Sequence, residues 1–256
     1  MRFRPCIDIH NGKVKQIVGG SLKDQGDQAV ENFSASQNAD YFANMYKKDG
    51  LKGGHVILLN PSKSPYYKKT LEQAKLALKA YPGGLQIGGG INPDNAKDFL
   101  SMGASHVIVT SYVFKDGQVK WDRLLKLKET VGKDHLVIDL SCRKKEGAYY
   151  IVTDRWQKFT KLKLTGQVLD QIAACCDEFL VHGVDVEGKS SGVEEDLVRL
   201  LKENCQIPVT YAGGIGSLEE LEKFRKLSDE KVDFTIGSAL DIFGGSIPYA
   251  KLIKAW

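Results

Sequence analysis

The stretch that decides the fold lies near the end of the chain, where "VTYAGGIGS" (209–217) is followed by a helical pattern and then by "VDFTIGSA" (232–239). The first segment begins as a short buried strand and continues into Gly213 and Gly214, whose missing Cβ atoms let the backbone approach an anion. Ser217 is a typical N-cap residue, so this loop leads into a helix N-terminus. Free backbone N–H groups and the helix dipole favour phosphate at such a place.

The second segment completes the same site. A strand over 232–236 ends at Gly237 and Ser238, and we expect another short helix to begin at Ala239. In a (β/α)8 barrel, the loops after strands 7 and 8 are the usual place for a phosphate site. We call Gly213, Gly214, Gly237 and Ser238 the second-half glycine site, and we predict that it binds phosphate.

A similar pattern occurs in the first half of the chain. Gly89 and Gly90 follow a buried strand, a helical pattern covers 93–102, and the next strand ends at Thr110 and Ser111. A lone Gly-Gly pair usually marks only a tight turn. Because the pattern recurs about half a chain length later, we interpret it as the mark of a duplicated half-barrel. We call Gly89, Gly90, Thr110 and Ser111 the first-half glycine site, and we predict that it binds a second phosphate.

The length of 256 residues fits one α/β domain, a (β/α)8 TIM barrel, with half-barrels at about 1–131 and 132–256. Hydrophobic residues make up 42% and charged residues 27%, which is usual for a soluble globular protein. No apolar run reaches the roughly 18 residues of a membrane span. We therefore expect no membrane insertion.

The formal net charge is +4, and lysines and arginines alternate with acidic residues along the chain. Because no dense basic stripe appears, a nucleic-acid partner is not expected, and an anionic small molecule is the simpler partner. The five cysteines show neither metal-ligand nor disulfide spacing, which indicates a reducing compartment. The first strand follows the initial methionine closely, so we expect a cytoplasmic protein, or a plastid stromal one if a transit segment has been removed.

Strands and helices alternate along the chain, as a (β/α)8 barrel requires. Strands are expected within "RPCIDIH", "GHVILLN", "LQIGGG", "HVIVTS", "HLVIDLSCR", "EFLVHG", "VTYA" and "VDFTI". Helices are expected over 39–49, 68–79, 93–102, 121–130, 167–176, 194–203, 218–227 and 248–255. Two excursions interrupt the alternation. One is a hairpin-like segment with Gly19 and Gly20, and the other is a long loop that contains "YYIVTDRWQKFT" (149–160).

Two aspartates stand in apolar strands at matching places of the two halves. Ile7-Asp8-Ile9 in strand 1 is echoed by Ile138-Asp139-Leu140 in strand 5. Burying a carboxylate in such a strand is costly unless the group is paired or has a function. If strands 1 and 5 lie opposite one another, the two carboxylates face each other across the barrel mouth. We favour a catalytic acid or base at Asp8 over a structural aspartate.

Two further residues are candidates at the mouth because of their loops. Gly20 lies in the segment that we expect to cover the mouth, and Trp156 lies in the second excursion. Trp156 is either a packing residue or a lid residue that stacks on a flat substrate group, and we slightly favour the lid.

The histidines lack the spacing of metal ligands. We expect all five to be structural, and we expect neither a metal nor a cofactor; they are His10, His55, His106, His135 and His182.

The order of "IDIHNGKVKQ", "LQIGGGI", "VIVTS", "DRWQ", "YAGGIGS" and "FTIGSA" resembles the ProFAR isomerase family of histidine biosynthesis over essentially the whole chain. "VIDLSCRK" (137–144) is similar to the eukaryotic branch of that family. The resemblance implies a cofactor-free Amadori rearrangement, in which an aminoaldose becomes an aminoketose. It also implies a small-molecule substrate with a phosphate at each end, which suits the two glycine sites. We expect a monomer.

The resemblance also implies roles for individual residues. Asp8 matches the strand 1 aspartate that removes a proton from ribose C2, and Arg143 matches an arginine after strand 5. The family acid lies on strand 5, where alignment on Arg143 selects Ser141 and the internal repeat selects Asp139. Both side chains are expected to face the interior. We choose Asp139, with Ser141 as its hydrogen-bond partner, because a serine hydroxyl is too weak an acid near neutral pH.

The sequence departs from the bacterial pattern at two places. The strand 6 threonine of bacterial members is missing, and Gly183, Val184 and Asp185 occupy its region. Asn92 stands where bacterial members often have arginine.

Two other functions remain open at this level. One is the related cyclase, imidazole glycerol phosphate synthase, which shares both glycine sites and needs ammonia from a glutaminase. The other is a barrel that binds a phosphosugar without turnover, which would leave the two strand aspartates unexplained.

Overall fold

A computed structural model describes residues 1–17, 29–153, 156, 158–189 and 191–256 of the chain. Within these residues, parallel pairings join the strands in the order β14-β13-β12-β9-β6-β5-β4-β1. A parallel bridge between Phe3 and Phe234 closes the ring, and the N–H of Arg4 donates to the Phe234 carbonyl at 2.8 Å. The predicted (β/α)8 barrel is confirmed. Its strands are β1 (Cys6–His10), β4 (Gly54–Leu58), β5 (Leu85–Gly88), β6 (Val107–Val109), β9 (Leu136–Lys145), β12 (Glu178–Gly183), β13 (Val209–Ala212) and β14 (Asp233–Thr235).

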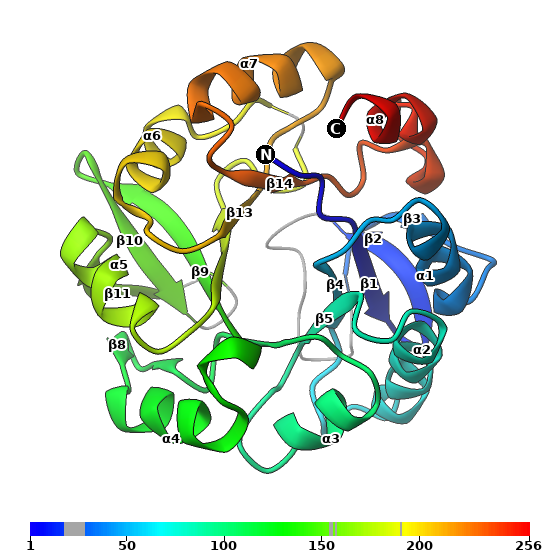
Figure 1. The fold of residues 1–256 in the computed structure, drawn as a ribbon, viewed down its shortest axis with the longest axis horizontal. Helices are drawn as coiled ribbons and strands as arrows, with labels where there is room; N and C mark the ends of the chain where they lie inside the picture. Colours follow the sequence, from blue (N-terminus) through cyan, green and yellow to red (C-terminus); the bar gives the residue numbers. More distant parts are fainter. Residues whose placement is uncertain (18–28, 154–155, 157, 190) are drawn as a thin grey trace.

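The helices form a ring around these strands (Figure 1). Each lies within a few residues of its expected range. They are α1 (Ala39–Lys48), α2 (Tyr67–Ala80), α3 (Ala96–Ser101), α4 (Trp121–Val131), α5 (Gly166–Ala173), α6 (Glu195–Asn204), α7 (Leu218–Ser228) and α8 (Tyr249–Ala255). Among the described helices, none is long and apolar enough to cross a membrane.

Helix α1 illustrates why these segments are helical and pack inward. Its buried residues Ala39, Phe42, Ala43 and Tyr46 recur at helical spacing, so they form one apolar face. An aspartate lies in the first turn and two lysines in the last, which complements the helix dipole. The Tyr46 hydroxyl donates to the carbonyl of Cys6 at 3.1 Å and so ties the helix to β1.

Strands β1 and β9 lie on opposite sides of the barrel, because three strands separate them on one side of the ring and three on the other (Figure 1). This is the arrangement expected for Asp8 and Asp139. The duplication of the two halves stays a prediction.

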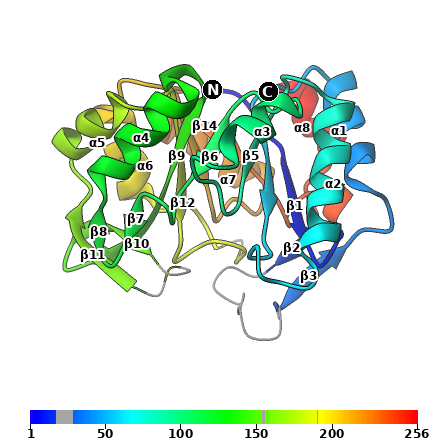
Figure 2. The same ribbon diagram turned by 90° about the horizontal axis from the view of Figure 1, so that it is seen from below.

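The second excursion is not a loop, so that prediction was wrong. Strand β9 continues to Lys145, turns, and pairs with β10 (Ala148–Thr153), which pairs in turn with β11 (Lys158–Lys163). The run "AYYIVT" is rich in aromatic and β-branched residues, which favour strands. A similar extension joins β1 to β2 (Lys13–Ile17) and β3 (Glu31–Ser34). Figure 2 shows these extensions on the side of the barrel opposite the termini.

Two helix starts also differ from expectation. No helix begins at Ala239; instead the one-turn 3-10 helix η3 spans Asp241–Phe243. Helix α3 begins at Ala96, later than expected, because Asn92 and Asn95 form a turn first. The Asn95 side chain accepts from the N–H of Asn92 at 2.9 Å, and Asn92 accepts from the N–H of Asp94 at 2.8 Å. Asparagine side chains compete in this way with helical hydrogen bonds.

A buried ion network fills the amino end of the barrel core. The Arg4 guanidinium contacts Asp233 at 2.9 Å and Glu178 at 3.5 Å. Glu178 also accepts from Gln86 at 3.0 Å and from Thr210 at 2.9 Å. These residues stand at or near the starts of five strands, so the network joins strands that are far apart in sequence.

We predict that Arg4→Met costs about 3–5 kcal/mol of unfolding free energy, because it leaves the buried Glu178 without its cation and leaves Asp233 with only the exposed Arg2. Urea unfolding followed by circular dichroism measures this loss.

Arg2→Met is the matched control, since Arg2 contacts the same Asp233 at 3.3 Å but its side chain is 64% exposed. It should cost at most about 1 kcal/mol. Equal losses in the two variants would contradict the prediction.

Candidate functional site

A cavity of about 350 Å³ opens at the carboxyl ends of the barrel strands. Active sites of this fold lie at that end. Most of the residues predicted from the sequence line it. They are Asp8, Gly89, Gly90, Thr110, Ser111, Asp139, Ser141, Trp156, Gly213, Gly214, Gly237 and Ser238. Gly20 lies outside the described residues, and Arg143 does not line the cavity.

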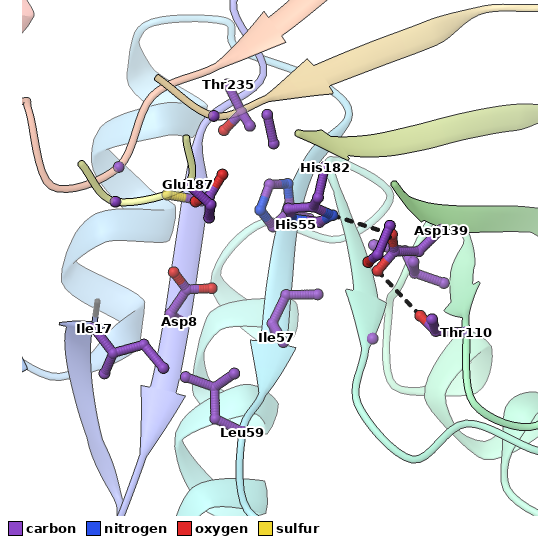
Figure 3. Close-up of a pocket in the computed structure, with 18 of the residues that line it drawn as sticks. Asp8, Ile17, His55, Ile57, Leu59, Thr110, Asp139, His182, Glu187 and Thr235 are labelled. Carbon is purple, nitrogen blue, oxygen red and sulfur yellow. Dashed lines mark hydrogen bonds and ion pairs between the residues drawn. The ribbon is translucent and has the colours of Figure 1, made fainter. Parts of the chain in front are cut away.

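Asp8 projects from β1 into one side of the cavity (Figure 3). Its Oδ2 accepts a hydrogen bond of 3.3 Å from the Gln16 amide on β2. Burial, and then the charge of nearby Glu187, raise the pKa of Asp8 to about 7. The nearby His182 opposes this rise. A carboxyl group with such a pKa exchanges protons readily near neutral pH, as a general base must.

Glu187 lies in the segment after β12 and faces the same part of the cavity as Asp8 (Figure 3). Its Oε2 is buried and has no hydrogen-bond partner in the described part of the chain. Burial raises the pKa of Glu187 as well. The hydroxyl of Thr235 is a second buried group there that has no hydrogen-bond partner among the described residues. Unsatisfied polar atoms are rare in protein interiors, so this wall of the cavity is suited to a polar ligand.

Asp139 projects from β9 on the opposite side and is held by several donors (Figure 3). The Thr110 hydroxyl donates to its Oδ2 at 3.0 Å, and the Ser141 hydroxyl donates to its Oδ1 at 3.2 Å. The His182 Nδ1 lies 3.1 Å from the same Oδ1. The predicted contact between Asp139 and Ser141 is therefore present in the structure.

His182 stands one residue before the end of β12, and its ring lies between the two aspartates (Figure 3). Burial alone would lower the pKa of His182, but the charge and the hydrogen bond of Asp139 override burial and raise it to about 9. His182 is therefore a cation at neutral pH. The neighbouring His55 is neutral, because burial and then His182 lower its pKa to about 3.

Trp156 closes the Asp139 side of the cavity. Its indole N–H donates to the Ser141 hydroxyl at 2.9 Å, and its ring centroid lies 6.1 Å from that of His182. Its backbone has a φ of 69°, which is uncommon for a residue with a side chain. This geometry fixes the Ser141 hydroxyl, which accepts from Trp156 and donates to Asp139.

The second-half glycine site is covered by the segment after β12. The N–H of Gly192 donates to the Gly214 carbonyl at 3.1 Å. A Cβ on Gly214, whose φ is 79°, would lie 1.9 Å from the Gly192 carbonyl oxygen. Ser217 caps α7 as predicted, accepting from the N–H of Glu220 at 3.1 Å. Glu220 in turn accepts from the N–H of Gly216 at 2.6 Å, so that N–H is already engaged.

The first-half glycine site is more open. Gly89 and Gly90 have φ values of 103° and 71°, and a Cβ on Gly90 would meet no atom of the described residues within 4 Å. A Cβ on Gly89 would lie 2.2 Å from the Leu58 carbonyl oxygen, so only glycine fits there. Ser111 is exposed at the cavity edge and is available to a ligand.

Arg143 is not among the residues that line the cavity. Its Nε donates to Asp185 at 2.8 Å, and its guanidinium lies 5.5 Å from the Phe159 ring centre. A substrate contact by Arg143 stays a prediction that this arrangement does not support.

Four further residues line the cavity that the sequence patterns did not single out: Gln16, His182, Glu187 and Thr235. The expectation that every histidine is structural was wrong for the cavity, because His55 and His182 line it. One signal was available for His182, since it falls at the carboxyl end of a barrel strand. Within the described residues, no group of three or more histidine, cysteine or acidic side chains is arranged to hold a metal ion.

Comparison with known proteins gives consistent matches over the whole chain. The sequence profile of a family described as "Histidine biosynthesis protein" matches residues 2–247. A chloroplastic 1-(5-phosphoribosyl)-5-((5-phosphoribosylamino)methylideneamino)imidazole-4-carboxamide isomerase of Medicago truncatula is 55% identical, over 100% of this chain and 81% of its own length. Isomerases of the same name from Yarrowia lipolytica and Saccharomyces cerevisiae are 47% and 41% identical, over 95% and 96% of this chain and 93% and 94% of their own lengths.

We predict that Glu187→Gln lowers the pKa of Asp8 from about 7, because it removes the charge that opposes ionisation of Asp8. The pKa should stay above its ordinary value, since burial is the larger cause. A carbon-13 NMR titration of the Asp8 carboxyl, assigned with Asp8→Asn, measures the change.

Asp185→Asn is the control, because Asp185 lies in the same segment but pairs with Arg143 outside the cavity lining. The Asp8 titration should not move in that variant. An unchanged midpoint in Glu187→Gln would show that Glu187 does not act on Asp8.

Proposed function

The chain belongs to the histidine biosynthesis protein family and is an isomerase of that pathway, and we propose that its cavity converts an aminoaldose to an aminoketose on a substrate with two phosphoribosyl groups. The isomerase names of the relatives confirm the isomerase prediction over the cyclase and over a barrel that only binds. The names of these relatives describe a substrate with two phosphoribosyl groups, in agreement with the two glycine sites.

The observation that carries the proposed mechanism is the pair of carboxylates on opposite strands. Asp8 on β1 and Asp139 on β9 line one cavity from its two sides. An aldose–ketose isomerisation needs a base that removes the C2 proton and an acid that protonates the ring oxygen. Asp8 has a pKa of about 7, so a large fraction of it is ionised and able to act as this base at neutral pH.

The acid belongs to the Asp139 side. Asp139 and His182 are in direct contact there, and together they carry a proton at neutral pH. Ser141 supports this group through its hydrogen bond to Asp139, and its own hydroxyl is too weak an acid to open the ring.

The two glycine sites flank the carboxylates and are proposed to bind the two phosphates. Backbone N–H groups next to glycines with positive φ form concave sites for anions. At the first site, no described residue crowds Gly90, and Ser111 is exposed. At the second site, the segment through Gly192 must make room for a phosphate beside Gly214.

Compartment and assembly state are also proposals. The Medicago truncatula relative is named chloroplastic, and this supports a plastid location for the present chain. A monomer remains our expectation.

The proposed chemistry is tested with the bisphosphorylated substrate in a spectroscopic assay that contains neither glutamine nor ammonia. The unaltered chain should turn the substrate over. Asp8→Asn should lower kcat by about 10³-fold or more, because it removes the base that takes the C2 proton.

Asp177→Asn is the matched control, since Asp177 also contacts a histidine, His106 at 3.2 Å, but does not line the cavity. Its kcat should be unchanged. Near-normal turnover in a folded Asp8→Asn protein would exclude Asp8 as the base.

The phosphate role of the first-half glycine site is tested with Gly90→Ala. The added methyl group meets no atom of the described residues, so we attribute an increase in KM to the ligand or to the backbone. We expect KM to rise about tenfold, the equivalent of about 1.4 kcal/mol of lost binding.

Gly83→Ala separates these causes, because Gly83 has nearly the same φ of 69°, also faces open space, and does not line the cavity. Both variants should lose about 1–2 kcal/mol of stability from the strained backbone. A KM that rises equally in both, or in neither, would argue against phosphate binding at Gly90.

A further inference from the structure

Among the described residues that line the cavity, His182 is the one cationic side chain. Its side chain is 17% exposed and that of Asp139 is 15% exposed, so their contact is largely shielded from water. Shielding strengthens both the charge interaction and the hydrogen bond. The contact between His182 Nδ1 and Asp139 fixes the orientation of the imidazole ring. The other ring nitrogen, Nε2, does not take part in this contact.

We infer that His182 is the general acid that protonates the ring oxygen of the sugar through Nε2, and that Asp139 is the positioning residue that holds its imidazolium. This inference rests on the proposed isomerase function and assigns the acid role within the Asp139–His182 pair.

The hydrogen bonds of Asp139 support this assignment. Thr110 and Ser141 both donate to its carboxylate, and the Nδ1–H of a protonated His182 adds a third donor. Such an arrangement stabilises a carboxylate that accepts hydrogen bonds. If Asp139 instead carried the proton towards the substrate, one of its oxygens would become a donor and would lose an accepted bond.

The charge state of His182 supports the same assignment. Although burial disfavours a charged imidazole, the neighbouring carboxylates, Asp139 first, keep the pKa of His182 at about 9. The ring therefore holds its proton at neutral pH, which is the state an acid needs before turnover. The indole of Trp156 lies beside the ring and shields it on one side.

The proton transfers balance over one turnover. His182 donates its proton to the ring oxygen, the bond from that oxygen to C1 breaks, and the nitrogen lone pair forms the C1–nitrogen double bond. Asp8 then takes the C2 proton, and the electrons of that C–H bond form a C1–C2 double bond while the nitrogen regains its lone pair. Finally C1 takes a proton from Asp8, and the C2 hydroxyl returns a proton to His182 as it becomes the ketone.

His182→Gln tests the inference, because glutamine retains a hydrogen-bond donor towards Asp139 but does not titrate. We expect kcat to fall by about 10²-fold or more with KM changed by less than about threefold. The alkaline decline of kcat/KM near pH 9 should also disappear, since it reports the loss of the His182 proton. A merely structural residue would not remove that decline.

His106→Gln is the matched control, because His106 also contacts a carboxylate, that of Asp177 at 3.2 Å, but does not line the cavity. Its kcat and pH profile should match those of the unaltered chain. A folded His182→Gln protein with near-normal kcat, or with the alkaline decline in place, would overturn the inference.

Asp139→Asn provides a second, independent variant if His182→Gln does not fold. If His182 is the acid, Asp139→Asn should keep measurable turnover, and its alkaline decline should move below pH 9, because the carboxylate that raises the pKa of His182 is gone. A folded Asp139→Asn protein without any turnover would identify Asp139 as the acid and overturn the inference. An unaltered chain that fails to convert the substrate would instead overturn the proposed function.

Discussion

The structure depends on one constraint, which is that charged groups inside a barrel of apolar strands must find partners within the barrel. The two ends of the core meet this constraint differently. At the amino end, Arg4 contacts Asp233 and Glu178, and Glu178 also accepts from neutral side chains. At the carboxyl end, one oxygen of Glu187 and the hydroxyl of Thr235 have no partner among the described residues.

Because of this difference, the amino end of the core contributes to stability, whereas the carboxyl end is suited to binding a ligand. A satisfied ion network links distant strands and closes the core, whereas unsatisfied polar atoms beside a cavity favour a polar ligand. Each side of the cavity holds a group whose pKa is raised, and the two groups end in different charge states. Burial and Glu187 raise the pKa of Asp8 to about 7, so it takes up protons easily for a carboxyl group. Asp139 raises the pKa of His182 to about 9, so this imidazole keeps its proton. One fold thus holds a partly ionised carboxyl group and a protonated imidazole at neutral pH, the states that the proposed base and acid require.

Much of this arrangement could be predicted from the sequence, because it rests on local patterns. Alternation of apolar strands and amphipathic helices predicted the barrel, and the repeated glycine pairs predicted which loops flank the cavity. Asp8 and Asp139 were recognisable because a carboxylate in an apolar strand is costly. The predictions that were wrong concern segments in which two local structures compete. Asparagine turns delayed α3, and the segment around Tyr149 and Tyr150 pairs with an extended β9 instead of forming a loop.

Glu187 and the contact that His182 makes could not be recognised for a different reason. Their significance arises from residues on other elements, such as Asp139 on β9, which lies 3.1 Å from His182 only after the barrel has closed. A single histidine in a strand has no distinctive spacing, and a glutamate in a loop is usually solvated. The pKa shifts of His182 and Glu187 therefore arise only in the closed barrel.

The most direct test of the account is the dependence of kcat/KM on pH for the unaltered chain. Activity should be lost as the pH falls through about 7, because Asp8 becomes protonated and cannot act as a base. It should be lost again as the pH rises through about 9, because His182 gives up its proton. An acid limb near the ordinary aspartate pKa of about 3.9, or an alkaline limb near the ordinary histidine pKa of about 6.5, would contradict the account.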